Sequence, residues 1–246
     1  MEIILSLTGI GIGILSGFFG MGGGTVLVPI LLLLGFEMRV AVGISIIQMT
    51  FSSIFGSYIN YRKGSLIFDD GLMVGFGGFV GGYLSGYLTA GISERNLQYV
   101  FIFFILFALY RLYTSPKEND IENSKSVSKF ILFIVGIGIG IISISIGVGG
   151  AIILIPILSG FLHYPFKKAV SAGLFFVVFS SISGLIGRLV YGEIDLYHGL
   201  IIGISSLLGV YLGILLKEKI HSQKLKYFTI IMYLIILIVM IYKIFK

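Results

Sequence analysis

Two glycine runs are the residues in this sequence best placed to do chemistry. Gly22, Gly23 and Gly24 precede Thr25, and Gly149 and Gly150 precede Ala151, each time inside a long apolar stretch. Glycine lets a backbone approach a ligand closely, and a helix start offers unpaired N–H groups and a partial positive charge. Because a short helix is expected to begin at each run, we predict two anion cradles made of backbone. The alternative is that these glycines serve only close helix packing.

Polar side chains in the apolar stretches that follow form a second set of candidates. Gln48 is the most polar side chain of its stretch, and it shares a helical face with Ser45 and Ser52 because their spacing is three and four. Serines in membrane helices also bond to their own backbone, which is the alternative role. The predicted substrate-lining side chains are Gln48, Ser52, Ser53, Ser180 and Ser181.

Groups that other chemistries need are missing from the sequence. There is no Cys, so disulfides and thiolate sites are excluded. The three His residues stand far apart, and we expect neither a metal nor a cofactor. A membrane-embedded enzyme would need a polar catalytic cluster, and no such cluster is evident, so we do not expect an enzyme. No Asp, Glu, Lys or Arg lies deep inside an apolar stretch, which argues against the titratable group of a proton-coupled carrier.

The elements that must position these residues are membrane-spanning helices. Hydrophobic residues make up 57% of the chain and charged residues 11%, against about 25% charged in soluble domains. Charge-free stretches such as Val40–Tyr61 and Ala169–Gly187 match the roughly 20 residues of one crossing. The net charge of +6 comes from short loops, which indicates lipid headgroups and not nucleic acid. We predict an all-α, multi-pass helical bundle.

The chain repeats itself. Gly20, Gly22, Gly23 and Pro29 recur 127 residues later, at Gly147, Gly149, Gly150 and Pro156. The segment 51–54, Phe-Ser-Ser-Ile, recurs 128 residues later, at 179–182. A register held over a whole half predicts two homologous repeats, residues 1–113 and 130–246, joined by a polar linker over 114–129.

The first apolar stretch of each half is too long for one crossing. A straight helix over Ile3–Phe36 would measure about 50 Å, against a membrane core of about 30 Å. Its glycine run and Pro29 predict a break, giving either a re-entrant hairpin or two short crossings. Counting the broken stretch as two segments gives five hydrophobic segments in each half and ten in all, whereas counting it as one gives eight. An odd number per half predicts inverted repeats, an arrangement common in secondary transporters.

Loop charges orient the bundle. Five segments per half place twelve of the 17 basic residues on one side, and the positive-inside rule makes that side cytoplasmic. The linker is therefore predicted to be cytoplasmic and both termini external. The twelve are Arg62, Lys63, Arg111, Lys117, Lys125, Lys129, Lys167, Lys168, Lys217, Lys219, Lys224 and Lys226, and the other side holds Arg39, Arg95, Arg188, Lys243 and Lys246.

The segment 13–24, Gly-Ile-Leu-Ser-Gly-Phe-Phe-Gly-Met-Gly-Gly-Gly, followed by Val28-Pro29 and echoed up to Pro156, resembles the TauE/SafE family of sulfite exporters. The resemblance covers nearly the whole chain. It implies a carrier of sulfite, or of a sulfur-containing organic anion, in a prokaryotic plasma membrane. The second copy departs from the pattern at Ala151, where the first has Gly24.

The expected function is transport of a small anion, in the direction of export and driven by the membrane potential. The partners expected are that anion and membrane lipids. A non-transporting membrane scaffold is the alternative, and it would tolerate bulky residues in the glycine runs. We also expect Gly23→Ala to be a small change that close helix packing tolerates.

Overall fold

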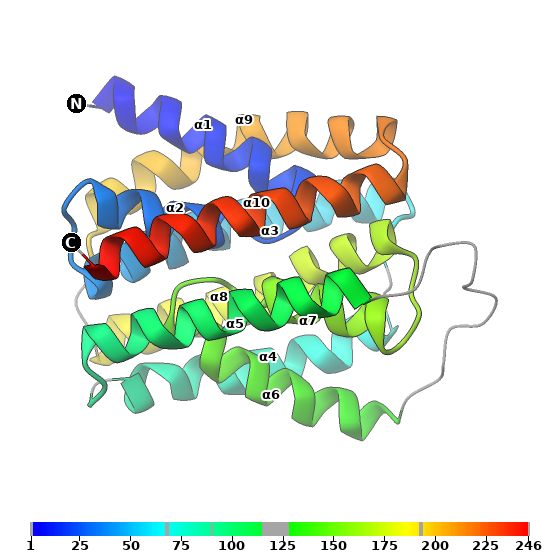
Figure 1. Cartoon of the computed structure of the whole chain (residues 1–246), viewed down its shortest axis with the longest axis horizontal. Helices are drawn as coiled ribbons and strands as arrows, with labels where there is room; N and C mark the ends of the chain where they lie inside the picture. Colours follow the sequence, from blue (N-terminus) through cyan, green and yellow to red (C-terminus); the bar gives the residue numbers. More distant parts are fainter. Residues whose placement is uncertain (1, 67–68, 90, 115–127, 192–193, 246) are drawn as a thin grey trace.

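The computed structural model of the chain describes residues 2–66, 69–89, 91–114, 128–191 and 194–245. Within these ranges it has ten α-helices and no strands, five in each half (Figure 1). The first half contains α1 (Glu2–Phe19), α2 (Gly24–Leu33), α3 (Met38–Arg62), α4 (Asp69–Thr89) and α5 (Glu94–Thr114). The second half contains α6 (Lys129–Ser145), α7 (Ala151–Gly160), α8 (Phe166–Tyr191), α9 (Leu196–Lys219) and α10 (Ser222–Phe245).

Among the described residues, six helices are long and apolar enough to cross a membrane: α1, α3, α5, α8, α9 and α10. Shorter apolar helices lie at Gly24–Leu33, Gly71–Ser85, Lys129–Ser145 and Ala151–Gly160. The predictions of an all-α fold and of a multi-pass membrane protein are therefore confirmed.

Each long apolar stretch is broken where the glycines predict it. Helix α1 ends at Phe19 and α2 begins at Gly24, while α6 ends at Ser145 and α7 begins at Ala151. Gly23 and Gly150, which precede the short helices, have φ of 91° and 90°. Only glycine adopts this left-handed conformation without strain. The ten residues of α2 or α7 rise about 15 Å, half of the membrane core.

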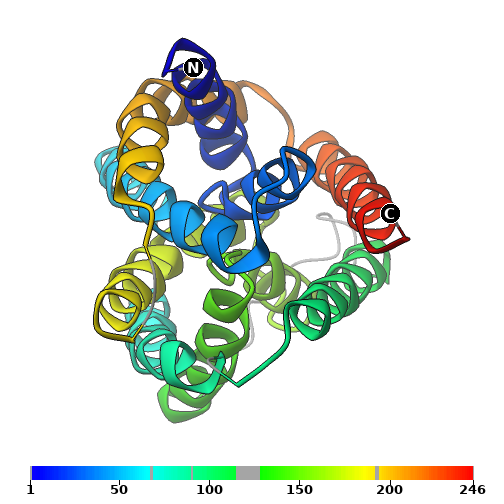
Figure 2. The same ribbon diagram turned by 90° about the vertical axis from the view of Figure 1, so that its left-hand side faces the viewer.

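Helices from the two halves interleave in the bundle. Helix α1 packs along α9, α6 packs along α4, and α3 lies against both α8 and α9. Glycine permits the closest of these contacts: a Cβ on Gly13 would lie 2.1 Å from the carbonyl oxygen of Ser206, and one on Gly209 would lie 2.0 Å from that of Ile10. Helices α5 and α10 pair along one flank (Figure 2).

The charged loops separate to the two ends of the bundle. At one end, Lys63 of α3 forms an ion pair of 2.6 Å with Glu218 of α9. At the other end, Arg188 of α8 donates to the backbone oxygen of Arg39, 3.2 Å away, and Tyr197 bonds to Glu2. The start of α3 thus meets the end of α8, and the two helices run antiparallel, as inverted repeats would require.

Both chain termini lie at the same end, opposite the end where α5 finishes and α6 starts (Figure 1). The repeat relationship, the domain boundaries and the cytoplasmic side stay predictions. Most of the linker, residues 115–127, lies outside the described residues.

Candidate functional site

The two glycine turns meet in the middle of the bundle. A Cβ on Gly24 of the first turn would lie 2.2 Å from the backbone oxygen of Gly147 in the second. Met49 of α3 and Val177 of α8 fill the space beside them, because both lie within about 3 Å of the Cβ position of Gly22 and of Gly149.

Matching serines fasten the two turns. Ser52 Oγ donates to the backbone oxygen of Gly22 over 2.8 Å, and Ser180 Oγ donates to that of Gly149 over 3.0 Å. Ser45 adds a bond between the halves, donating to Gly147 over 2.7 Å. The paired bonds explain why α3 and α8 both carry serine at this position.

The neighbouring serines have a different role. Ser53 donates to the backbone oxygen of Thr50, and Ser181 donates to that of Val178, both within their own helix. They are buried, but their described bonds do not reach the glycine turns.

The first turn carries a buried amide without partners. A Cβ on Gly23 would lie 2.6 Å from Gln48 Oε1 and 2.9 Å from Gln48 Nε2, so the amide lies directly against the turn. Gln48 is fully buried, and neither amide atom has a hydrogen-bond partner among the described residues. The hydroxyl of Thr25, in the first turn of α2, is buried and unpartnered as well. A buried polar group without a partner costs about 1–3 kcal/mol, which a polar ligand would offset.

The second turn is apolar at the corresponding place. Phe176 stands where the first half has Gln48, and a Cβ on Gly150 would lie 2.4 Å from its ring. The departure at Ala151 also has a local reason. In the first half Ser45 occupies the space beside Gly24, whereas its counterpart Gly173 leaves room for the Ala151 methyl group. The two cradles predicted from the sequence are therefore unequal in polarity.

All twelve residues proposed from the sequence are buried. The turns, Gln48 and the serines thus lie inside the bundle, shielded from both ends. A ligand could reach them only if the helices move.

A comparison with known families decides what kind of protein this is. The family model described as sulfite exporter TauE/SafE matches residues 5–240. The chain belongs to this family. The resemblance read from the glycine–proline signature is thereby confirmed.

Curated relatives place this TauE/SafE protein among membrane transporters. The chain is 28% identical over 208 residues to the probable membrane transporter protein YdhB of Bacillus subtilis, covering 82% of this chain and 84% of the relative. It is 30% identical over 244 residues to a probable membrane transporter protein of Methanocaldococcus jannaschii, covering 91% and 89%. No solved structure matches the chain. The protein is thus a membrane transporter of the TauE/SafE family.

Two buried cations in this TauE/SafE protein were missed by the sequence analysis. Lys217 is 2% exposed and Arg188 is 9% exposed, although from the sequence both were counted only among the basic residues that orient the bundle. Each follows the end of an apolar stretch, as the sequence indicates, but its burial in the bundle was not predicted. Both residues stand near helix ends, where hydropathy is ambiguous. One sequence signal could have drawn attention to Arg188: it lies 128 residues after Asn60, at the matching position of the second half.

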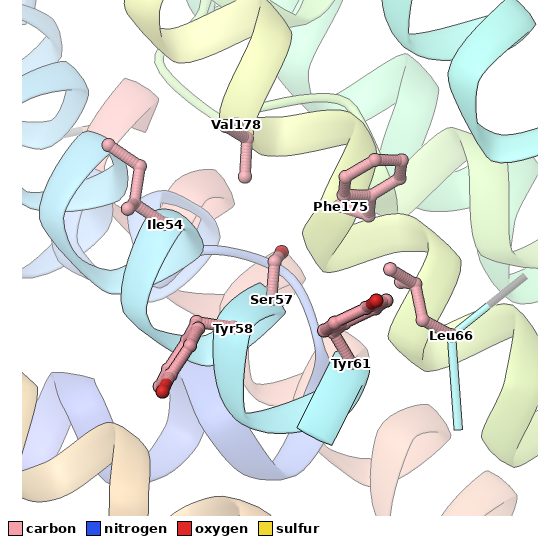
Figure 3. A pocket seen from close by; sticks show the side chains of 7 residues that line it. All are labelled: Ile54, Ser57, Tyr58, Tyr61, Leu66, Phe175 and Val178. Atoms are coloured by element: carbon pink, nitrogen blue, oxygen red, sulfur yellow. The ribbon is translucent and has the colours of Figure 1, made fainter. Parts of the chain in front are cut away.

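A groove between α3 and α8 is a separate feature of the TauE/SafE bundle (Figure 3). It has a volume of about 270 Å³. The side chains around it are mostly apolar or aromatic, and none of the predicted site residues is among them. Its lining consists of Ile54, Ser57, Tyr58, Tyr61, Leu66, Phe175 and Val178. We therefore place the candidate site at the glycine turns.

Proposed function

We propose that this protein exports a small anion, sulfite or a sulfur-containing organic anion, from the cytoplasm. The observation that carries the proposal is the amide of Gln48, which is buried and unpartnered against the glycine turn at the start of α2. Membership of the family supports sulfite or a related anion as the substrate class.

The first turn has the chemistry to hold an oxyanion. Backbone N–H groups at the start of α2 lack partners within the helix, and the helix dipole favours negative charge there. Gln48 Nε2 and the Thr25 hydroxyl add two side-chain donors. Because these donors are neutral, they bind an anion without forming an ion pair, so the anion can still be released.

Transport requires the buried site to open to each side in turn. Because the helices of the two halves interleave, movement of α1 and α9 against α4 and α6 would expose one face of the turns at a time. Rocking of one helix bundle against the other around a fixed site is a common mechanism of alternating access in transporters with inverted repeats; here each bundle would contain helices of both halves.

The membrane potential supplies the driving force in this proposal. An inside-negative potential favours outward movement of an anion by about 2.3 kcal/mol per charge per 100 mV. The sequence shows no carboxylate inside an apolar stretch that would carry a coupling proton.

Flux in proteoliposomes tests the proposal. Radiolabelled sulfite, sulfate, thiosulfate and a sulfonate are each loaded, with and without an imposed potential. We expect saturable efflux of at least sulfite or the sulfonate, accelerated by a negative interior. Efflux of all four at the rate of protein-free vesicles would contradict the proposed function.

A further inference from the structure

Lys217 forms a buried polar cluster away from the glycine turns. Its Nζ donates to Asn60 Oδ1 over 2.8 Å and to Ser171 Oγ over 3.0 Å. The three residues come from α9, α3 and α8, and all are at least 98% buried. Ser65 also donates to Asn60 Oδ1, over 3.3 Å.

The cluster holds a cation without a counter-charge. Among the side chains that the structure describes, no carboxylate lies within ion-pair distance of Lys217, and Glu218 pairs with Lys63 instead. Burying an ion costs several kcal/mol unless it is paired. A lysine ammonium has three donors, and the two described bonds use two of them.

Asn60 presents a second unused donor. Its Oδ1 accepts from Lys217 and from Ser65, which fixes the orientation of the amide. Its Nδ2 is buried and has no hydrogen-bond partner in the described part of the chain. An ammonium and an amide N–H with spare capacity therefore share one buried place, and both suit an anion.

The surroundings add positive charge. Lys63 and Lys167 lie at the same end of the bundle, and Lys167 Nζ donates to the backbone oxygen of Glu218 over 3.1 Å. Of these lysines, Lys63 pairs with the Glu218 carboxylate, whereas Lys167 contacts only the backbone oxygen of that residue. The side chains of the Lys63–Glu218 ion pair are 29% and 39% exposed, so this pair is partly open to solvent at the same end of the bundle.

We propose that Lys217, Asn60 and Ser171 form a second oxyanion site, an entry station at the end of the bundle that we predict to be cytoplasmic. Its ligand is the transported anion, so in naming the ligand this proposal rests on the proposed function. The bound anion neutralises Lys217 and accepts from Asn60 Nδ2 before it moves to the glycine turns. Arg188, the repeat counterpart of Asn60, puts a buried cation at the opposite end.

Equilibrium binding of radiolabelled sulfite and sulfate to the purified full-length protein in phosphatidylcholine nanodiscs tests the site. Lys217→Met removes the ammonium and keeps the apolar stem. Lys219→Met is the matched control, because it makes the same change in charge at an exposed position of the same helix end. Asn60→Asp is the second variant, since its carboxylate would pair with Lys217 inside the protein and take the place of the anion.

We expect Lys217→Met and Asn60→Asp to weaken one class of binding by at least about tenfold, and Lys219→Met to leave it unchanged. Wild-type binding in both variants, or equal losses in Lys217→Met and Lys219→Met, would overturn the site. If Lys217→Met does not fold, Asn60→Asp decides alone.

Two further binding measurements separate the Lys217 site from the glycine-turn site and from lipid binding. Gln48→Met tests the glycine-turn site: retained binding there would count against the proposed function and leave the Lys217 site standing. Nanodiscs containing phosphatidylglycerol test the source of the anion. Displacement of labelled sulfite by this lipid would overturn the entry station, because the ligand would then be a headgroup phosphate.

Discussion

The side-chain amide of Gln48 lies so close to Gly23 that a Cβ added to that glycine would come within 2.6 Å of Gln48 Oε1. No other described residue offers this amide a hydrogen bond. At the matching place in the second half, the ring of Phe176 lies against Gly150. A turn beside an unpartnered amide therefore faces a turn beside an aromatic ring, and we propose the anion site at the first of them.

Replacing Gln48 by a charged isostere should make transport depend on pH. Gln48→Glu places a carboxyl group beside the proposed anion. Its charged form repels the anion, whereas its protonated form keeps a donor, so flux relative to wild type should be lowest at high pH and recover as the pH falls. Efflux measured across a pH series, normalised to wild type, checks this. A ratio to wild type that stays constant with pH would argue against contact between Gln48 and the anion.

Glycine substitutions should separate turn positions from helix positions. Gly23 has φ of 91°, so Gly23→Ala is expected to destabilise the protein by about 1–3 kcal/mol, contrary to the tolerance expected from the sequence. Gly11 lies within α1 with nothing within 4 Å of its Cβ position. Gly11→Ala should be neutral or stabilise by up to about 1 kcal/mol. Thermal denaturation of both variants in detergent measures the difference, and equal melting temperatures would refute the strain argument.

The orientation in the membrane can be tested by cysteine labelling, because the chain has no native Cys. Ser124→Cys lies in the linker and should react with an impermeant thiol reagent only after the cells are opened. Ser93→Cys, exposed between α4 and α5 at the opposite end, should react in intact cells. The reverse pattern would invert the assignment of the cytoplasmic side.

The helices and their breaks could be predicted from the sequence because each rests on a local property. Apolar length fixes the spans, and consecutive glycines before α2 and α7 fix the breaks. The sequence placed Ser52 on a helical face with Gln48, and Ser180 only in the repeated Phe-Ser-Ser-Ile segment, so their hydrogen bonds to the turns were not predicted. Their acceptors, Gly22 and Gly149, lie 30 and 31 residues away.

The asymmetry of the site and the burial of Lys217 could not be predicted in the same way. Gln48 and Phe176 are counterparts in the alignment of the halves, but their opposite effects on the two turns depend on packing. Lys217 precedes a charged helix end, a pattern typical of an exposed residue. Its burial arises because α3 and α8 pack around it. Its partners on these helices, Asn60 and Ser171, are 157 and 46 residues away in the sequence.

The driving force can be separated from proton coupling. If efflux follows the membrane potential, clamping the potential at zero should slow it, whereas collapsing the pH gradient alone should leave it nearly unchanged. Proteoliposomes with ionophores that set each gradient independently provide the measurement. Equal sensitivity to both gradients would indicate a coupling proton, carried by the protein or by the substrate.

The dependence of sulfite efflux rate on internal sulfite concentration, compared between wild type and Gln48→Met at a fixed potential, tests the central claim most directly. Methionine fills nearly the same volume but donates no hydrogen bond, so the fold should persist while the anion loses a donor. We predict wild-type abundance in the membrane and a half-saturating concentration raised about tenfold, as expected for one hydrogen bond to a charged group. Saturation at the wild-type concentration in a well-folded Gln48→Met protein would contradict an anion site at the first glycine turn.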